Sequence, residues 1–119
     1  MASSQSQPIG RITISEKAVA TIAAHAALRS YGIVGMASRN LADGIAYVLA
    51  QDPRHGVEVS QRHNRLQIDL YVVIEYGTRV TSVSSSVART VRYQVERSLG
   101  IPIGEVNVHV QDLHISFTE

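Results

Sequence analysis

Apolar and polar residues alternate along the segment 66–76, which is the pattern of a β-strand with one buried face. The apolar positions are Leu66, Ile68, Leu70, Val72 and Ile74. The residues between them are Gln67, Asp69, Tyr71, Val73 and Glu75. We therefore expect a strand with a core on one side and a largely solvated sheet face on the other.

Shorter segments of the same kind predict further strands. Val57–Ser60 precedes the long strand, and the connection 61–65 between them predicts a hairpin. In the segment 106–111, valines alternate with Asn107, His109 and Gln111, which predicts a last strand. Two short extended segments are also expected, over Arg11–Ile14 and Ile33–Met36.

Apolar residues spaced three and four apart predict helices between these strands. The main helix covers 80–99, where apolar residues recur at every fourth position. Its stripe is Val83, Val87, Val91, Val95 and Leu99. Another helix is expected from the N-cap Ser15 to about Ser30, with an alanine-rich stripe. Leu41–Ala50 predicts a short helix that Gly44 weakens.

The expected fold class is α+β: a two-layer sandwich of a mainly antiparallel sheet with helices packed on one face. One-sided burial in the hairpin and in the last strand indicates that the helices cover a single face. Residues 1–9 are polar and are predicted to form a flexible N-terminal tail. Residues 10–119 contain no repeat and no linker, so they are predicted to form a single domain.

Composition narrows the classes of function. The chain has 11 basic and 10 acidic residues, and the resulting net charge of +1 disfavours a nucleic-acid binder on bulk charge. It contains no cysteine, which excludes disulfides and thiolate chemistry. No apolar run approaches the roughly 20 residues of a membrane span, so direct membrane insertion is not expected. The predicted compartment is the cytoplasm.

Histidines are the first candidates for catalytic or metal-binding residues. The five histidines are His25, His55, His63, His109 and His114. No two of them stand four apart on a predicted helix, and His109 and His114 are five apart on a strand, so they are expected to face opposite sides. Nucleophile elbows, phosphate-binding loops and dinucleotide motifs are absent from the sequence. We therefore predict no catalytic residues, no cofactor and no metal.

The solvated sheet face is the candidate interaction surface. Its residues are Tyr71, Val73, Asn107, His109 and Gln111. Tyr71 and Val73 would serve as apolar anchors inside a polar rim, which suits a protein contact. One aromatic residue beside Asp69 and Glu75 does not suit an RNA-binding sheet, which needs several stacked aromatics and basic residues. An ordinary solvated face is the alternative.

Motifs in a fixed order along residues 10–113 resemble the alkaline shock protein family of bacteria. The first is Gly10-Arg11-Ile12-Thr13-Ile14-Ser15, which enters an alanine-rich helix. The next are Ile33-Val34-Gly35-Met36, Leu41-Ala42-Asp43-Gly44-Ile45 and Gly56-Val57-Glu58-Val59. The most telling are Ile68-Asp69-Leu70-Tyr71-Val72-Val73-Ile74-Glu75-Tyr76-Gly77 and Val106-Asn107-Val108-His109-Val110. Between these two, the long helix ends in Leu99-Gly100-Ile101-Pro102, which also fits.

The resemblance implies a small, non-enzymatic cytoplasmic protein of the envelope stress response. It also implies a position beneath the membrane through an anchoring protein partner, and self-association into homo-oligomers. The family has no established catalytic residues to transfer. The first hypothesis is therefore an interaction or scaffold module near the membrane.

Two other functions are alternatives to this one. One is a nucleic-acid- or anion-binding regulator that uses Arg79, Arg89, Arg92 and Arg97 along the main helix. It requires an affinity that falls steeply with salt. The other is a small enzyme, which requires a polar pocket with perturbed ionisable groups. No sequence motif supports either.

Overall fold

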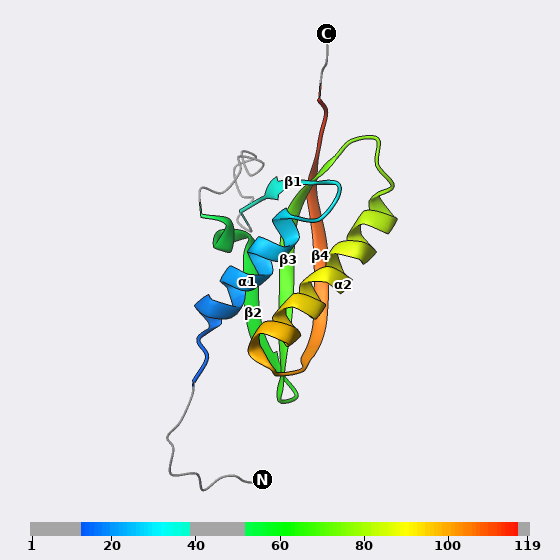
Figure 1. Ribbon diagram of the computed structural model, residues 1–119. Coiled ribbons are helices and arrows are strands. Elements are labelled where there is room, and N and C mark those ends of the chain that lie inside the picture. Colours follow the sequence, from blue (N-terminus) through cyan, green and yellow to red (C-terminus); the bar gives the residue numbers. More distant parts are fainter. Residues whose placement is uncertain (1–12, 39–51, 117–119) are drawn as a thin grey trace, which may run out of the picture.

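The computed structural model describes residues 13–38 and 52–116 (Figure 1). In chain order the elements are α1 (Glu16–Leu28), β1 (Ile33–Met36), the 3-10 turn η1 (Pro53–Gly56), β2 (Val57–Arg62), β3 (Arg65–Glu75), α2 (Val80–Leu99) and β4 (Ile103–His114). Figure 1 shows both α-helices on the same side of the sheet. The predicted α+β sandwich, with helices packed on one face, is confirmed.

Strand β3 is the centre of the four-stranded sheet. Strands β1 and β2 both run antiparallel to it and follow one another along it: β1 pairs with residues 72–74 and β2 with residues 65–70. The third pairing, between β3 and β4, is parallel. Helix α2 carries the chain back between β3 and β4, and such a crossover joins parallel strands. The sheet is thus antiparallel in two of its three pairings and mixed as a whole.

The core lies between the sheet and the two helices. The predicted valine stripe of α2 is confirmed, because Val87, Val91 and Val95 are fully buried and Val83 nearly so. Helix α1 packs through small side chains, which let it approach the sheet closely. Its buried residues are Val19, Ala20, Ala23, Ala24, Ala26 and Ala27. On β3, the residues that face the helices are buried at Ile68, Leu70, Val72 and Ile74.

The ends of the helices follow from local chemistry. Ser15 accepts a hydrogen bond on its hydroxyl from the backbone N–H of Ala18, 3.1 Å away, and so satisfies a free N–H group of α1. Helix α1 ends at Leu28, slightly before the predicted Ser30. Gly100 ends α2 in the left-handed conformation with φ of 72°, which glycine adopts without steric cost.

Three sequence predictions concern segments that lie partly or wholly outside the described residues. The expected strand at Arg11–Ile14 is wrong for Thr13 and Ile14, which are exposed and unpaired immediately before the helix cap. The rest of that segment, the tail 1–9 and the expected helix Leu41–Ala50 lie outside the described residues. Among the described helices, neither is long and apolar enough to cross a membrane.

Candidate interaction surface

A polar cluster occupies the sheet face opposite the helices, across the pairing of β3 with β4. Asp69 is paired with Asn107, and Tyr71 with His109. The carboxylate of Asp69 is the centre of the cluster because three side chains reach it. His109 Nε2 lies 2.9 Å from Oδ1, Asn107 Nδ2 donates to the same oxygen over 3.2 Å, and Gln67 Nε2 donates to Oδ2 over 3.3 Å.

The ionisation of Asp69 reflects this environment. The side chain is 14% exposed, and partial burial by itself raises the pKa of a carboxyl group. Hydrogen bonds from His109, Gln67 and Asn107 favour the ionised form and outweigh that effect, so the pKa of Asp69 is lowered from its ordinary value. An ionised carboxylate only accepts hydrogen bonds, so Nε2 of His109 is the donor in this contact.

Tyr71 and His109 stack beside this carboxylate. Their ring centroids are 4.6 Å apart and their planes differ by 12°. His109 is held on one side by the stack and at Nε2 by Asp69, yet 43% of its side chain remains exposed. The structure therefore brings together three of the five predicted surface residues, Tyr71, Asn107 and His109. It adds Asp69 and Gln67, which the sequence placed on the same face.

The expectation that Val73 is an exposed anchor is wrong, because its side chain is 1% exposed. Val72, Val73 and Ile74 are buried in succession, so both faces of β3 are covered at this point. A continuous apolar run is the usual signal for a strand buried on both faces. The sequence does contain such a run at residues 72–74, but the alternation on either side of it favoured the prediction of a one-sided strand.

Two bulges in β4 change which side chains share a face. In the register with β3, the pairing skips Gly104 at one end of the strand and Gln111 at the other. Gln111 is therefore the extra residue of a bulge, and it does not continue the alternation of Asn107 and His109. Beyond it the faces are exchanged, so His114 pairs with Glu75 as His109 pairs with Tyr71.

The expectation that His109 and His114 face opposite sides is accordingly wrong. Both are paired with open-face residues of β3 that stand four positions apart. That separation corresponds to about 13 Å along a strand, too far for two ligands of one ion. Within residues 13–38 and 52–116, no three His, Asp or Glu side chains converge in a way that could hold a metal.

The outer edge of β4 is the second part of the surface. In the described part of the chain, β4 pairs with β3 alone, so its other edge is open. The bulges leave the segment 105–110 regular between them. Only Glu105 in that segment carries a formal charge when His109 is neutral. An open edge with few charges can pair with another strand.

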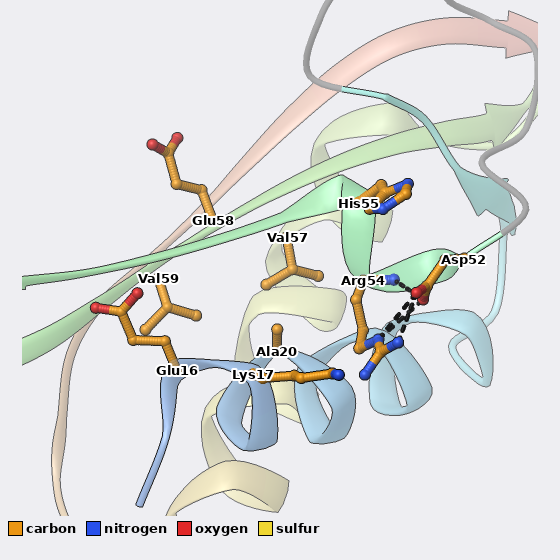
Figure 2. A pocket seen from close by; sticks show the side chains of 9 residues that line it. All are labelled: Glu16, Lys17, Ala20, Asp52, Arg54, His55, Val57, Glu58 and Val59. Atoms are coloured by element: carbon orange, nitrogen blue, oxygen red, sulfur yellow. Dashed lines mark hydrogen bonds and ion pairs between the residues drawn. The ribbon is translucent and has the colours of Figure 1, made fainter.

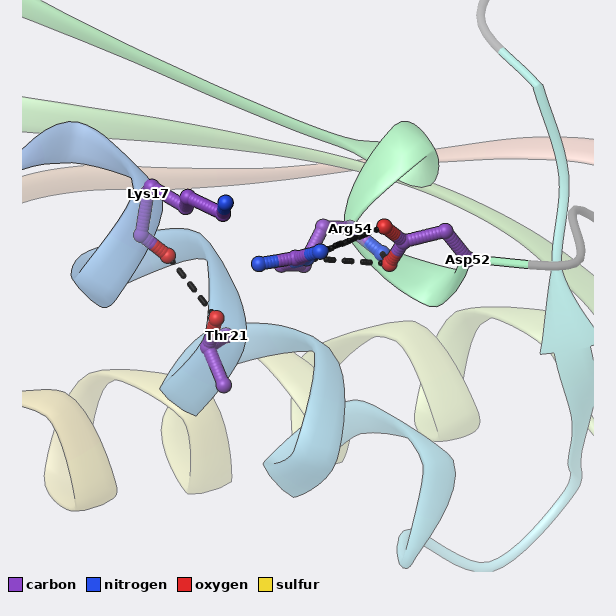
Figure 3. A network of polar contacts seen from close by, with 4 residues as sticks. All are labelled: Lys17, Thr21, Asp52 and Arg54. Carbon is purple, nitrogen blue, oxygen red and sulfur yellow. Dashed lines mark hydrogen bonds and ion pairs between the residues drawn. The ribbon is translucent and has the colours of Figure 1, made fainter.

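A separate cleft of about 560 Å³ lies where the start of α1 meets η1 and β2 (Figure 2). Its apolar floor is formed by Ala20, Val57 and Val59, and charged side chains stand around it. Arg54 forms a two-pronged ion pair with Asp52, with an Nη2–Oδ2 distance of 2.6 Å (Figure 3). The side-chain hydrogen bonds from Arg54 hold the pKa of Asp52 well below its ordinary value. Sequence analysis did not predict this pair.

The arginines proposed for the alternative function are differently engaged. Arg92 donates from Nη1 to the carbonyl of Ile103 over 2.6 Å and from Nη2 to that of Gly104 over 3.1 Å. Arg97 donates to the hydroxyl of Tyr93 over 2.7 Å. Arg79 and Arg89 are exposed. Two of the four arginines thus already bind groups of the protein itself, which weakens the case for an anion-binding row along α2.

A comparison with known protein families settles the relationship of this chain. Residues 4–115 match the model of the alkaline shock protein family, whose description gives a cell envelope-related function. The chain belongs to the alkaline shock protein family. The predicted resemblance is thereby confirmed, and it covers the whole of the fold described above.

Individual relatives agree with this family. The uncharacterized protein YloU of Bacillus subtilis is 37% identical over 109 residues, which cover 90% of this chain and 91% of that protein. A stress response regulator gls24 homolog of Streptococcus pyogenes is 29% identical over 107 residues, which cover 87% of this chain and 59% of the relative. Among solved structures, a zinc form of the MamM CTD matches with a TM-score of 0.48 and 13% identity. The match covers 85% of this chain and 86% of the MamM chain. That likeness is too slight to bear on function.

Proposed function

We propose that this chain is a non-enzymatic interaction module of the envelope stress response, which self-associates and binds a protein partner. The proposed contact surface comprises Tyr71, Asn107, His109 and the open edge of β4. The protein is cytoplasmic, and an anchoring partner holds it near the membrane. The observation that carries the proposal is a stacked pair, the partly exposed Tyr71 and the exposed His109, next to a long, weakly charged strand edge.

This surface needs to change little in order to bind a partner. Interfaces favour aromatic anchors inside a polar rim, and they avoid charges at the centre. The stack and the hydrogen bonds to Asp69 fix the rings before any contact forms, which lowers the entropic cost of association. The adjoining edge of β4 offers backbone groups to a further strand. Membership of a family with a cell envelope-related function supports the location.

Light scattering after size exclusion, over a range of protein concentrations, tests self-association. The mass of the wild-type chain should rise with concentration. The double variant Tyr71→Glu with His109→Glu should remain monomeric, because it places two carboxylates at the centre of the contact. Tyr93→Glu with Arg89→Glu is the matched control, since both residues are exposed on α2. A wild-type chain that is monomeric throughout would overturn the self-association half of the proposal.

The partner half is tested by pull-down from native lysate after membranes are solubilised. The proposal expects an integral membrane protein that the wild type and the α2 control retain and the Tyr71/His109 variant loses. Equal retention by all three proteins would show that the surface is wrongly assigned. Recovery of nucleic acid, with an affinity that falls steeply as salt rises, would favour the anion-binding regulator instead.

A further inference from the structure

Exposed apolar side chains gather at one end of the molecule. Eight large apolar residues of the described ranges are substantially exposed, and six of them belong to this end. We define the apolar tip as Leu28, Tyr31, Tyr76, Val80, Leu113 and Ile115. Tyr31 is 81% exposed, Tyr76 60% and Ile115 50%. The tip lies away from the Tyr71–His109 pair along the sheet, so it is a separate surface.

Hydrogen bonds between segments distant in sequence place these residues together. The backbone N–H of Glu75 donates to the carbonyl of Gly32 over 2.9 Å, which sets the turn of Tyr31 beside the end of β3. The N–H of Tyr76 donates to the carbonyl of His114 over 2.7 Å, which sets the end of β4 on its other side. Figure 1 shows the α1–β1 turn, the β3–α2 connection and the end of β4 at this same end.

The two turns that carry the tyrosines are held by their own side chains. The hydroxyl of Ser30 donates to the carbonyl of Ala26 over 3.0 Å, at the end of α1. The hydroxyl of Thr78 donates to the carbonyl of Glu75 over 2.7 Å, just after β3. These bonds hold the backbone of both turns, so a contact made by the two rings needs little ordering of the backbone.

Each turn combines its tyrosine with an exposed arginine. Arg29 stands two residues before Tyr31, and Arg79 stands three residues after Tyr76. Glu75 and Asp112, the acidic residues of the neighbouring strand ends, lie in register positions of the opposite sheet face. The Asp112 carboxylate accepts a hydrogen bond from the N–H of Leu113 over 2.8 Å. The helix side of the tip thus carries aromatic, aliphatic and cationic groups.

We propose that the apolar tip rests directly on an anionic lipid bilayer. Tyrosine rings settle at the level of lipid head groups, aliphatic side chains reach the acyl boundary, and arginines meet phosphates. The tip consists of two turns and a strand end that lie together at one end of the molecule, so their side chains can enter a deformable surface at the same time. The contact needs no membrane-spanning helix. It is independent of the surface around Tyr71 and His109, and it would supplement an anchoring partner.

Sedimentation with lipid vesicles tests this proposal on the full chain. Vesicles of phosphatidylcholine with about 30% phosphatidylglycerol should bind the wild type more tightly than phosphatidylcholine alone. Tyr31→Ser with Tyr76→Ser should weaken binding about tenfold or more, because it removes the two most exposed anchors. Arg29→Gln with Arg79→Gln should remove the preference for anionic lipid, at about fivefold per arginine.

Tyr93→Ser is the matched control, because Tyr93 is 55% exposed but lies on α2 outside the tip. It should bind vesicles as the wild type does, and so should the variant Tyr71→Glu with His109→Glu. That last result separates this proposal from the self-association proposal. Failure of the wild type to bind anionic vesicles would overturn the lipid contact, and so would undiminished binding by the Tyr31/Tyr76 variant. A changed oligomeric mass in that variant, without vesicle binding, would assign the tip to a second copy of the chain.

Discussion

His109 donates a hydrogen bond from Nε2 to Oδ1 of Asp69, 2.9 Å away, and so joins two strands whose residues are 40 positions apart. The bond crosses the parallel pairing of β3 with β4 on the face that α1 and α2 leave uncovered. The same carboxylate receives the amides of Gln67 and Asn107. Asp69 therefore orients the side chains of Gln67, Asn107 and His109 on the open sheet face.

The first prediction concerns Asp69→Asn. The carboxylate pKa is lowered in the folded chain, so ionised Asp69 contributes stability that is present above the unfolded pKa of about 3.9. This contribution is lost as the pH falls through the lower, folded-state pKa. We expect Asp69→Asn to lower the free energy of unfolding by about 1–3 kcal/mol near neutral pH. The difference from the wild type should shrink below about pH 4.

Urea unfolding near neutral pH and at about pH 3 measures this difference. Glu105→Gln provides the control. It removes a carboxylate from an exposed position of β4, on the same sheet face as Asp69. A deficit of Asp69→Asn that is equally large at both pH values would contradict the assigned role of the ionised carboxylate.

A second prediction concerns the start of α1. The hydroxyl of Ser15 accepts a hydrogen bond from the N–H of Ala18 over 3.1 Å, and alanine cannot replace it. Ser15→Ala should therefore cost about 1 kcal/mol of unfolding free energy. Ser98→Ala, at an exposed position in the last turn of α2, should have little effect. Thermal unfolding of the two variants compares them, and equal melting temperatures would exclude a capping role.

The sequence predicted the elements whose signal is local. The valine stripe of α2 and the apolar face of β3 are both confirmed as buried, and the alternation of β3 fails only at Val73. The hairpin turn is shorter than predicted, because His63 and Asn64 adopt positive φ angles of 54° and 65° and close it with two residues. A tight turn of this kind suits the twist of the two strands.

Features that depend on pairing were not accessible in the same way. Strand β4 runs parallel to β3 because α2 carries the chain across the sheet between them. Neither composition nor the alternation of residues indicates the direction of a strand. The bulge at Gln111 reverses the alternation of β4, so every face assigned beyond it by counting residues is wrong. Val73 is buried although Tyr71 and Glu75 on the same face are partly exposed, and it is a position where β1 and β4 both pair with β3.

A third prediction concerns the core beneath α2. Val87 and Val91 are both 0% exposed, so Val87→Asp or Val91→Asp would bury a carboxylate without a partner. Either substitution should cost several kcal/mol and unfold the domain at ambient temperature. Gln94→Asp introduces the same side chain at an exposed position of α2 and should leave the fold intact. Circular dichroism distinguishes the outcomes, and an unchanged melting temperature for both valine variants would mean that α2 faces the other way.

The last prediction concerns the contact between α2 and the first bulge of β4. The guanidinium of Arg92 donates to two carbonyl groups at this bulge, those of Ile103 at 2.6 Å and Gly104 at 3.1 Å. Glu96 accepts a hydrogen bond from the N–H of Ile103 over 2.9 Å.

Arg92→Met keeps the apolar stem and removes both donors, so it should cost about 1–3 kcal/mol of unfolding free energy. Arg92→Lys should recover only part of this loss, because a single ammonium does not reproduce the planar fork. Urea unfolding measures the series, with Arg89→Met at an exposed position of the same helix as the reference. If Arg92→Met proved as stable as Arg89→Met, the guanidinium would not be what holds the start of β4 against the helix.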